Sequence, residues 1–184
     1  MKKFIYLLML PMFVALVACG GKSGNADKSS NMALQDSVDV HGIQRMQTSK
    51  IEVDIKYKDK DYRSYVYRTP DESLPHVKNE MGDTYVDNKI LVRLTRGGTT
   101  VFDKAFTKND FSSIVDADFL SKSMLEGIVY DKTTPQGFVY AASVCYPKTD
   151  YYIPLSITIT ADGKMTVEKV DLLEEDYSEE IPKN

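Results

Sequence analysis

Histidine, cysteine and tryptophan are scarce in this chain, which has two His, two Cys and no Trp among 184 residues. His41 and His76 form no HExxH motif and belong to no Cys/His cluster with the spacing of a zinc site. Gly97-Gly98 lacks the Gly-Lys-Ser/Thr that would complete a phosphate-binding loop. The sequence therefore predicts no metal and no cofactor, and both histidines are expected to be solvated.

The two cysteines, Cys19 and Cys145, are far apart in the sequence. If Cys19 is modified, Cys145 has no partner within the chain, and stability must come from packing rather than from a disulfide. Cys145 falls on an expected strand, where no neighbouring base or helix N-terminus would lower its pKa. We expect a packed thiol there rather than a nucleophile.

Acidic residues outnumber basic ones. The chain has 23 Lys and Arg against 27 Asp and Glu, and it contains no basic cluster. Binding to nucleic acid relies on patches of Lys and Arg that contact phosphates. The composition therefore argues against a nucleic-acid partner.

The chain has one long hydrophobic run, residues 4–17, which follows Lys2 and Lys3. Its 14 residues are too few to cross a bilayer, which takes about 20, but they suit the core of a signal peptide. The run ends in Leu16-Val17-Ala18-Cys19, which resembles the lipobox of bacterial lipoproteins. The resemblance implies that residues 1–18 are removed and that Cys19 receives the lipid that anchors the protein to a membrane. The alternative is an ordinary secretion signal whose cleavage site lies beside a Cys.

The remaining chain divides into three parts. Residues 19–42 are rich in Gly, Ser, Asn and Asp and are interpreted as a flexible tether. Residues 43–173 form a single β-rich domain, and residues 174–184 form an acidic tail that we expect to be solvated.

Alternation of apolar and polar residues runs through the domain, as in Ile51, Val53 and Ile55. This period of two predicts half-buried strands. The expected strands span residues 51–57, 62–68, 88–96, 101–106, 125–130, 138–146, 151–160 and 164–172, with a loop at residues 69–83. The fold class is therefore mainly β, with about eight antiparallel strands in a lipocalin-like barrel or a β-sandwich. The short connections favour the barrel.

Turn residues predict the register of two hairpins. A three-residue loop at residues 97–99 would set Leu94 opposite Phe102, and a loop at residues 161–163 would set Ile159 opposite Met165. A short helical insert is expected from Thr107, where Asp110 would complete a capping box, to Ser123.

The sequence from about Tyr85 to Val170 resembles a domain-of-unknown-function family of Bacteroides-type envelope lipoproteins. The motifs that carry the likeness are Val86-Asp87-Asn88-Lys89-Ile90, Arg96-Gly97-Gly98, Phe102-Asp103-Lys104, Leu125-Glu126-Gly127, Ala142 to Pro147, Tyr152 to Leu155 and Ala161-Asp162-Gly163-Lys164. The resemblance implies a Gram-negative envelope protein and no assigned activity. Because no acidic run follows Cys19, the periplasmic face of the outer membrane is the expected location.

Tyrosines on expected strands are candidates for a binding surface, since each combines a large apolar ring with a polar tip. We single out Tyr62, Tyr65, Tyr67 and Tyr140; Tyr146, Tyr151 and Tyr152 also lie on or near strands. The first hypothesis is a non-catalytic module that binds a small apolar ligand or an envelope protein. The alternatives are a hydrolase built on Asp110, Asp116 and Asp118, whose carboxylates equally suit helix caps, and a structural or assembly factor.

The lipobox leads to a direct test. The variant Cys19→Ala should no longer partition with membranes, because the thiol that accepts the lipid is gone. Membrane and soluble fractions would be compared by immunoblotting. Membrane association that persists in the variant would contradict lipidation at Cys19.

Overall fold

The computed structural model describes residues 37–171, which all lie in one compact unit of the chain, residues 33–184. The expected signal peptide, Cys19, most of the tether and the acidic tail lie outside the described residues. The strand β1 (Ser37–Val38) falls within the segment assigned to the tether.

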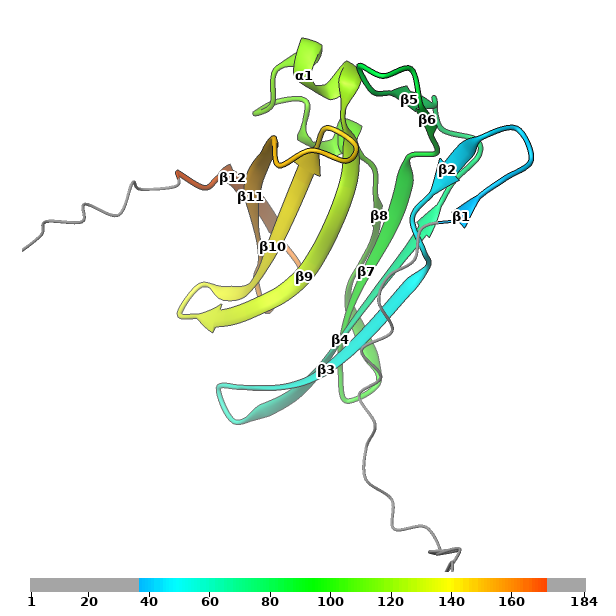
Figure 1. Cartoon of the computed structure of the whole chain (residues 1–184). Coiled ribbons are helices and arrows are strands. Elements are labelled where there is room, and N and C mark those ends of the chain that lie inside the picture. The colour runs from blue at the N-terminus through cyan, green and yellow to red at the C-terminus, as the bar shows by residue number, and fades with distance from the viewer. Residues whose placement is uncertain (1–36, 172–184) are drawn as a thin grey trace, which may run out of the picture. The chain divides into compact units, whose positions relative to one another are not determined.

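The eight main strands are antiparallel, as predicted from the eight alternating segments, and they form two sheets of four strands each (Figure 1). The first sheet has the order β3-β4-β7-β8, and its strands are β3 (Ser49–Tyr57), β4 (Lys60–Pro70), β7 (Asn88–Arg96) and β8 (Thr99–Phe106). The second sheet has the order β12-β11-β10-β9, and its strands are β9 (Met124–Thr134), β10 (Gly137–Cys145), β11 (Tyr152–Ile159) and β12 (Met165–Lys169).

A third, small sheet was not predicted. It has the order β1-β2-β6-β5 and is built from β1, β2 (Ile43–Arg45), β5 (Val77–Lys78) and β6 (Thr84–Tyr85). Both β5 and β6 lie in the connection between β4 and β7: β5 falls within the predicted loop at residues 69–83, and β6 follows it directly. Strands of two residues are too short for an alternating pattern to be recognised.

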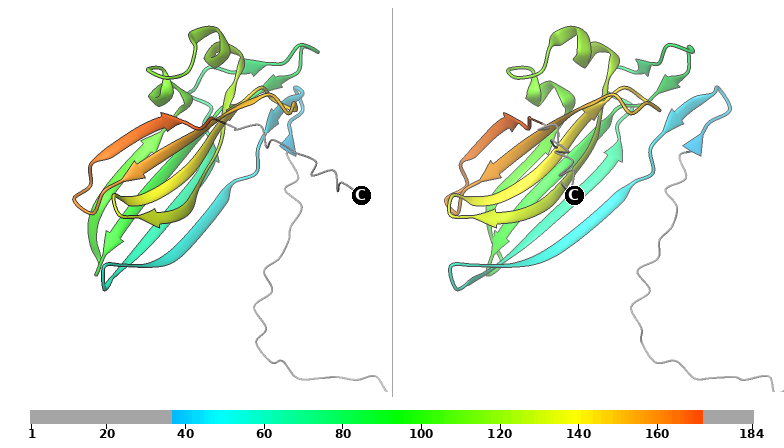
Figure 2. Two further views of the ribbon diagram at one scale, coloured as in Figure 1. Left: turned by 90° about the vertical axis from the view of Figure 1, so that its left-hand side faces the viewer. Right: turned by 60° about the vertical axis from the view of Figure 1, so that its left-hand side comes forward.

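The two main sheets pack face to face as a β-sandwich and do not close into a barrel (Figure 2). The preference for a lipocalin-like barrel was therefore wrong, and the sandwich alternative is confirmed. The reason lies between β8 and β9, where a 3₁₀ helix (η1, Lys108–Phe111) and a helix (α1, Ala117–Lys122) separate the strands. Without a tight hairpin at this point, β9 begins a new sheet instead of extending the first.

The predicted hairpin registers are confirmed, although one turn differs. Leu94 lies opposite Phe102, but the chain turns through two residues, Gly97 and Gly98, with φ of 53° and 84°. Val101 is the extra residue, because Thr95 pairs with Thr100. The buried pairs therefore keep their register through a bulge rather than through a longer loop. In the last hairpin, Ile159 lies opposite Met165 as predicted.

Short polar side chains define the helical insert at the positions expected from the sequence. The Asp110 carboxylate accepts a hydrogen bond of 2.8 Å from the backbone N–H of Thr107. Asp116 precedes α1 and accepts hydrogen bonds from the backbone N–H groups of Asp118 and Phe119. These contacts satisfy backbone donors that a helix start leaves without partners.

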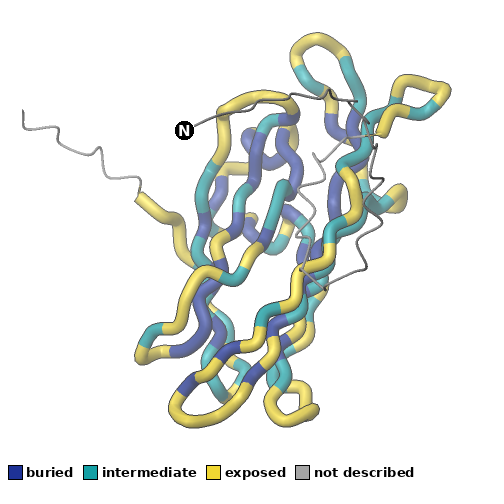
Figure 3. Tube along the Cα trace, turned by 60° about the horizontal axis from the view of Figure 1, so that its bottom comes forward, coloured by how far each residue is buried: buried dark blue, intermediate teal, exposed yellow. Residues whose placement is uncertain are grey.

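The inward faces of both sheets form one apolar core (Figure 3). Tyr140 is fully buried, and its hydroxyl donates a hydrogen bond of 2.9 Å to Ser64 Oγ. Phe138 packs against Tyr62 with ring centroids 4.6 Å apart. Each phenol thus contributes its ring to the core, and the Tyr140 hydroxyl keeps a hydrogen bond that burial would otherwise remove.

Gly137 follows the two-residue turn between β9 and β10, with φ of 152°. A Cβ at this position would lie 2.2 Å from the carbonyl oxygen of Ile159 on β11. Gly137→Ala should therefore lower the free energy of unfolding by about 2 kcal/mol or more, as measured by urea denaturation.

Gly127→Ala on β9 is the matched control, because a Cβ at Gly127 would meet no atom within 4 Å. Its effect should stay within about 1 kcal/mol. Equal effects of the two substitutions would contradict the close approach between β10 and β11.

Candidate functional site

Two hollows open side by side at the end of the sandwich that carries α1 and the β5–β6 hairpin. The smaller has a volume of about 300 Å³ and is lined by Met46, Met124 and Cys145, among others. The larger, which we name the end groove, has a volume of about 800 Å³. It lies between residues 78–81, Lys122 and the β10–β11 turn, and Pro147, Lys148 and Thr149 line both hollows.

The turn from β10 to β11 forms one wall of the end groove. The backbone N–H of Tyr146 donates to the carbonyl oxygen of Tyr151 at 3.0 Å, and that of Thr149 donates to the carbonyl oxygen of Tyr146 at 3.2 Å. Lys148 takes a left-handed conformation, with φ of 60°. The closed turn holds Tyr146 and Tyr151 next to each other at the ends of the two strands.

Three aromatic rings pack together along this wall. Phe119 of α1 stacks on Tyr146 with centroids 4.7 Å apart, and Tyr151 contacts both rings edge-on, at 5.3 Å from Phe119 and 5.2 Å from Tyr146. Phe119 is buried, whereas Tyr151 is 61% exposed. The buried ring fixes the exposed one, so that an apolar surface stands in solvent in a defined position.

The opposite wall is the β5–β6 hairpin, whose tip carries Met81. Asn79 and Asp83 close the hairpin: Asn79 Nδ2 donates to Asp83 Oδ2 at 3.0 Å, and the backbone N–H of Asp83 donates to Asn79 Oδ1 at 2.9 Å. Met81 is 82% exposed between them. A flexible thioether in this position suits contact with varied apolar partners.

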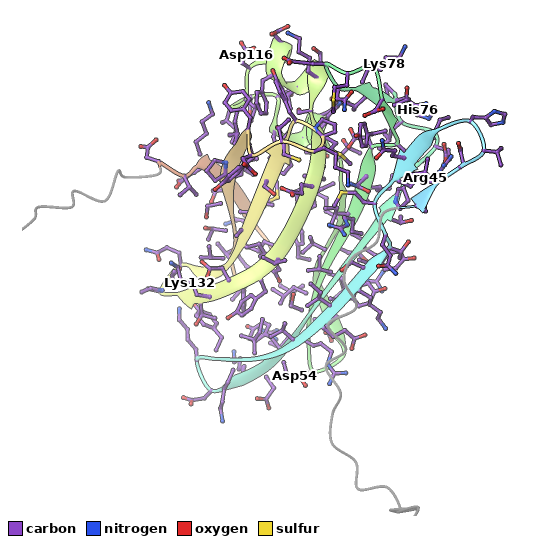
Figure 4. All side chains as sticks on the ribbon, viewed as in Figure 1. Arg45, Asp54, His76, Lys78, Asp116 and Lys132 are labelled. Carbon is purple, nitrogen blue, oxygen red and sulfur yellow. The ribbon has the colours of Figure 1, made fainter. Side chains whose placement is uncertain are left out.

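Lysines also line the end groove. Lys78, Lys122 and Lys148 line it, against one acidic lining residue, Glu80. Figure 4 labels both Lys78 and Asp116 at this end of the sandwich, whereas Lys132 and Asp54 lie toward the other end. Lys122 Nζ lies 2.7 Å from Asp118, and this hydrogen bond raises the pKa of Lys122. The groove therefore combines an apolar wall with a rim that carries three lysines against two carboxylates, Glu80 in the lining and Asp118 paired with Lys122.

A buried ion pair supports the elements around both hollows. Lys108 Nζ of η1 lies 3.4 Å from Asp87 Oδ2, just before β7, and the two side chains are 10% and 2% exposed. Lys108 Nζ also donates to the carbonyl oxygen of Ser123 at 2.6 Å. Asp87 Oδ1 accepts from the backbone N–H groups of Asn88 at 2.8 Å and Leu125 at 2.9 Å. These bonds fix the start of β9, where Met124 lines the smaller hollow.

Burial raises the pKa of Asp87, and the nearby Lys108 ammonium opposes this effect. The carboxylate therefore depends on Lys108 and on its two backbone donors for its charge. Loss of any of these partners would leave an uncompensated charge in the interior.

A comparison with known families assigns most of the chain to one of them. The family described as a domain of unknown function (DUF4738) matches residues 28–167, which is most of the chain. The chain belongs to this family. No curated protein matches it. The match extends further toward the N-terminus than the resemblance detected from the motifs, and it includes all of the small sheet.

The four tyrosines singled out from the sequence do not meet in one site of the DUF4738 domain. Tyr62 and Tyr140 lie in the core. Tyr65 and Tyr67 stack on the outer face of the first sheet, with centroids 6.3 Å apart. The end groove is lined instead by Tyr146 and Tyr151. Their position on either side of Pro147 was the sequence feature that could have indicated them, whereas no sequence feature indicated Met81.

The other chemical candidates have structural partners. Asp110 pairs with Lys104, Asp116 caps α1 and Asp118 pairs with Lys122. His41 lies in the turn between β1 and β2, and His76 Nε2 lies 3.4 Å from Glu72. Within residues 37–171, no group of three or more His, Cys, Asp or Glu side chains could hold a metal ion.

Cys145 is buried, as expected for a packed thiol. Burial, together with the Glu126 carboxylate nearby, raises its pKa to about 12. The thiol is therefore protonated at neutral pH and is a poor nucleophile. Among the described residues, no helix is long and apolar enough to cross a bilayer.

The buried pair predicts a large and pH-dependent loss of stability. Lys108→Ala should lower the free energy of unfolding at pH 7 by about 3–5 kcal/mol, because Asp87 is left charged and unpaired in the interior. At low pH the folded-state carboxyl is neutral with or without Lys108, and the penalty of losing Lys108 appears as pH rises through the raised folded-state pKa of Asp87. The loss should therefore be smaller at about pH 4 than at pH 7.

Urea denaturation at the two pH values would measure this difference. Lys122→Ala serves as the control, because both Lys122 and its partner Asp118 are exposed and solvent screens their interaction, so that the change in stability should be small at both pH values. A loss that Lys108→Ala and Lys122→Ala share, or one that does not change with pH, would contradict the role given to Asp87.

Proposed function

We propose that this DUF4738 protein is a non-catalytic binding module of the bacterial cell envelope, anchored by lipid on Cys19, and that it holds a protein partner in the end groove. The anchor is supported by the charged start, the 14-residue apolar run and the lipobox-like Leu16 to Cys19. The tether then places the domain at a distance from the membrane.

The observation that carries the binding role is that exposed apolar side chains stand on both walls of the end groove. Tyr151 and Met81 face the same groove from different elements and are 61% and 82% exposed. Complete burial of a large apolar side chain contributes about 1.5–3 kcal/mol. Tyr151 is already held by Phe119 and Tyr146, so that little side-chain entropy is lost when a partner covers it.

The shape of the site favours a polypeptide over a small apolar molecule. The interior between the sheets is filled by side chains such as Phe138, Tyr140 and Leu125, which are completely buried. The end groove, by contrast, opens to solvent and is rimmed by charged residues. Interfaces between proteins typically combine an aromatic centre with a charged rim of this kind.

Site-specific photo-crosslinking in cells tests this proposal. Benzoylphenylalanine in place of Tyr151 or Met81 should give an intermolecular adduct of one defined mass. Tyr65, a half-buried tyrosine on the outer face of the first sheet, is the matched control position and should give none. The partner identified from the adduct should bind the purified domain, and Lys78→Glu with Lys122→Glu should weaken that binding at least tenfold.

Equal adducts from Tyr65 and Tyr151 would contradict a specific site at the groove. Extra mass on the purified domain that native mass spectrometry detects and denaturation removes would instead indicate a small ligand. Removal of that mass by Tyr151→Ala would place the small ligand in the groove and overturn the choice of a protein partner.

A further inference from the structure

The described chain ends beside the end groove. Leu155 of β11 pairs with Lys169 of β12, and the backbone N–H of Val170 donates to the carbonyl oxygen of Pro154 at 3.1 Å. Tyr151, on the groove wall, precedes Pro154 by three residues. At about 3.3 Å per residue of strand, the last described residues lie roughly 10 Å from the groove.

The segment that follows is long enough to reach and fill the groove. Residues 172–184 number 13 and, when fully extended, span at most about 45 Å. Tyr177 is six residues beyond Asp171 and so has a reach of about 20 Å, twice the estimated separation. The chain therefore needs no rearrangement of the sandwich for this segment to contact the groove.

The composition of the segment complements the lining. Residues 172–184 contain five acidic residues and one basic residue, and the acidic residues flank Tyr177. The groove presents three lysines and one glutamate around Tyr146 and Tyr151, and one of the lysines, Lys122, is paired with Asp118. Carboxylates can thus meet the positive rim while one aromatic ring meets the exposed ring of Tyr151.

We infer that the acidic C-terminal segment of this chain, residues 172–184, docks in the end groove, with Tyr177 against the aromatic wall and its carboxylates against the lysines. A segment joined to the domain competes at a high effective concentration, so that an external partner must displace it. The docking stands by itself, whereas this competition with a partner rests on the proposed function.

Disulfide trapping in the mature chain tests the docking. In a Cys19→Ala background, Glu80→Cys places a thiol on the groove and Ser178→Cys places one beside Tyr177, with the three lysines and the aromatic wall retained. Cys145 is buried and does not compete. Under mild oxidation, the pair should form an intramolecular disulfide that peptide mapping detects.

Ser156→Cys with Ser178→Cys is the matched control. Ser156 lies opposite Glu168 of β12, close to the start of the segment, and on the outer face of the second sheet. Trapping at position 80 should exceed trapping at position 156 at least fivefold. Lys78→Glu with Lys122→Glu should reduce this ratio at least threefold, as should a rise in salt from about 0.05 to 1 M.

Equal trapping at positions 80 and 156 would overturn the proposal, because the segment would then sample the surface without docking. A ratio that survives both charge reversal and high salt would overturn the recognition chemistry. Benzoylphenylalanine at Tyr177 in the otherwise unaltered chain provides a second reading: adducts must map to residues 78–81 or 146–151, and adducts elsewhere count against docking.

The two proposals fail separately. If the segment does not dock, the intermolecular adducts expected from Tyr151 are unaffected and should be as strong in the full chain as in one ending at Asp171. If the groove has no protein partner, those adducts are missing while intramolecular trapping persists.

Discussion

The carboxylate of Asp87 is the group on which the end of this domain that carries the two hollows depends. It lies between the small sheet and β7, contacts Lys108 of η1 and accepts the backbone N–H of Leu125 at the start of β9. Three segments distant in sequence are thus joined through one buried charge. A charge in the interior requires its partners, since desolvation costs several kcal/mol per ion. The arrangement therefore favours one relative position of the two main sheets over looser packings.

The helical insert between β8 and β9 explains both the fold and the end groove. Between β8 and β9 the chain leaves the first sheet through η1 and α1. As a result β8 and β9 do not pair, and each forms an edge of its own sheet. Phe119 of α1 then supplies the ring on which Tyr146 and Tyr151 pack. The insert that prevents closure of a barrel therefore also builds the aromatic wall, so that the architecture and the candidate site have a common origin.

The sequence was most informative where a local rule decides the structure. Alternation located the eight main strands, and burial of Leu94 and Phe102 determined the register of a hairpin even though its turn was predicted incorrectly. Asp110 and Asp116 are hydrogen-bonded at helix starts, as their spacing indicated. The groove was not predictable in this way, because Met81, Phe119 and Tyr151 meet only through the packing of the sheets, and a two-residue strand such as β5 has no period. The tyrosines chosen from strand position alone include Tyr140, whose ring is needed by the core.

The burial of Cys145 has a consequence for the redox chemistry of the chain. Thiol–disulfide exchange proceeds through the thiolate, and a thiol with a pKa of about 12 is ionised in only about one molecule in 10⁵ at pH 7. A single unpaired cysteine in an oxidising compartment would otherwise form mixed disulfides with small thiols or with other proteins. In this domain folding protects the Cys145 thiol from oxidation, because the thiol becomes buried when β10 packs against β9.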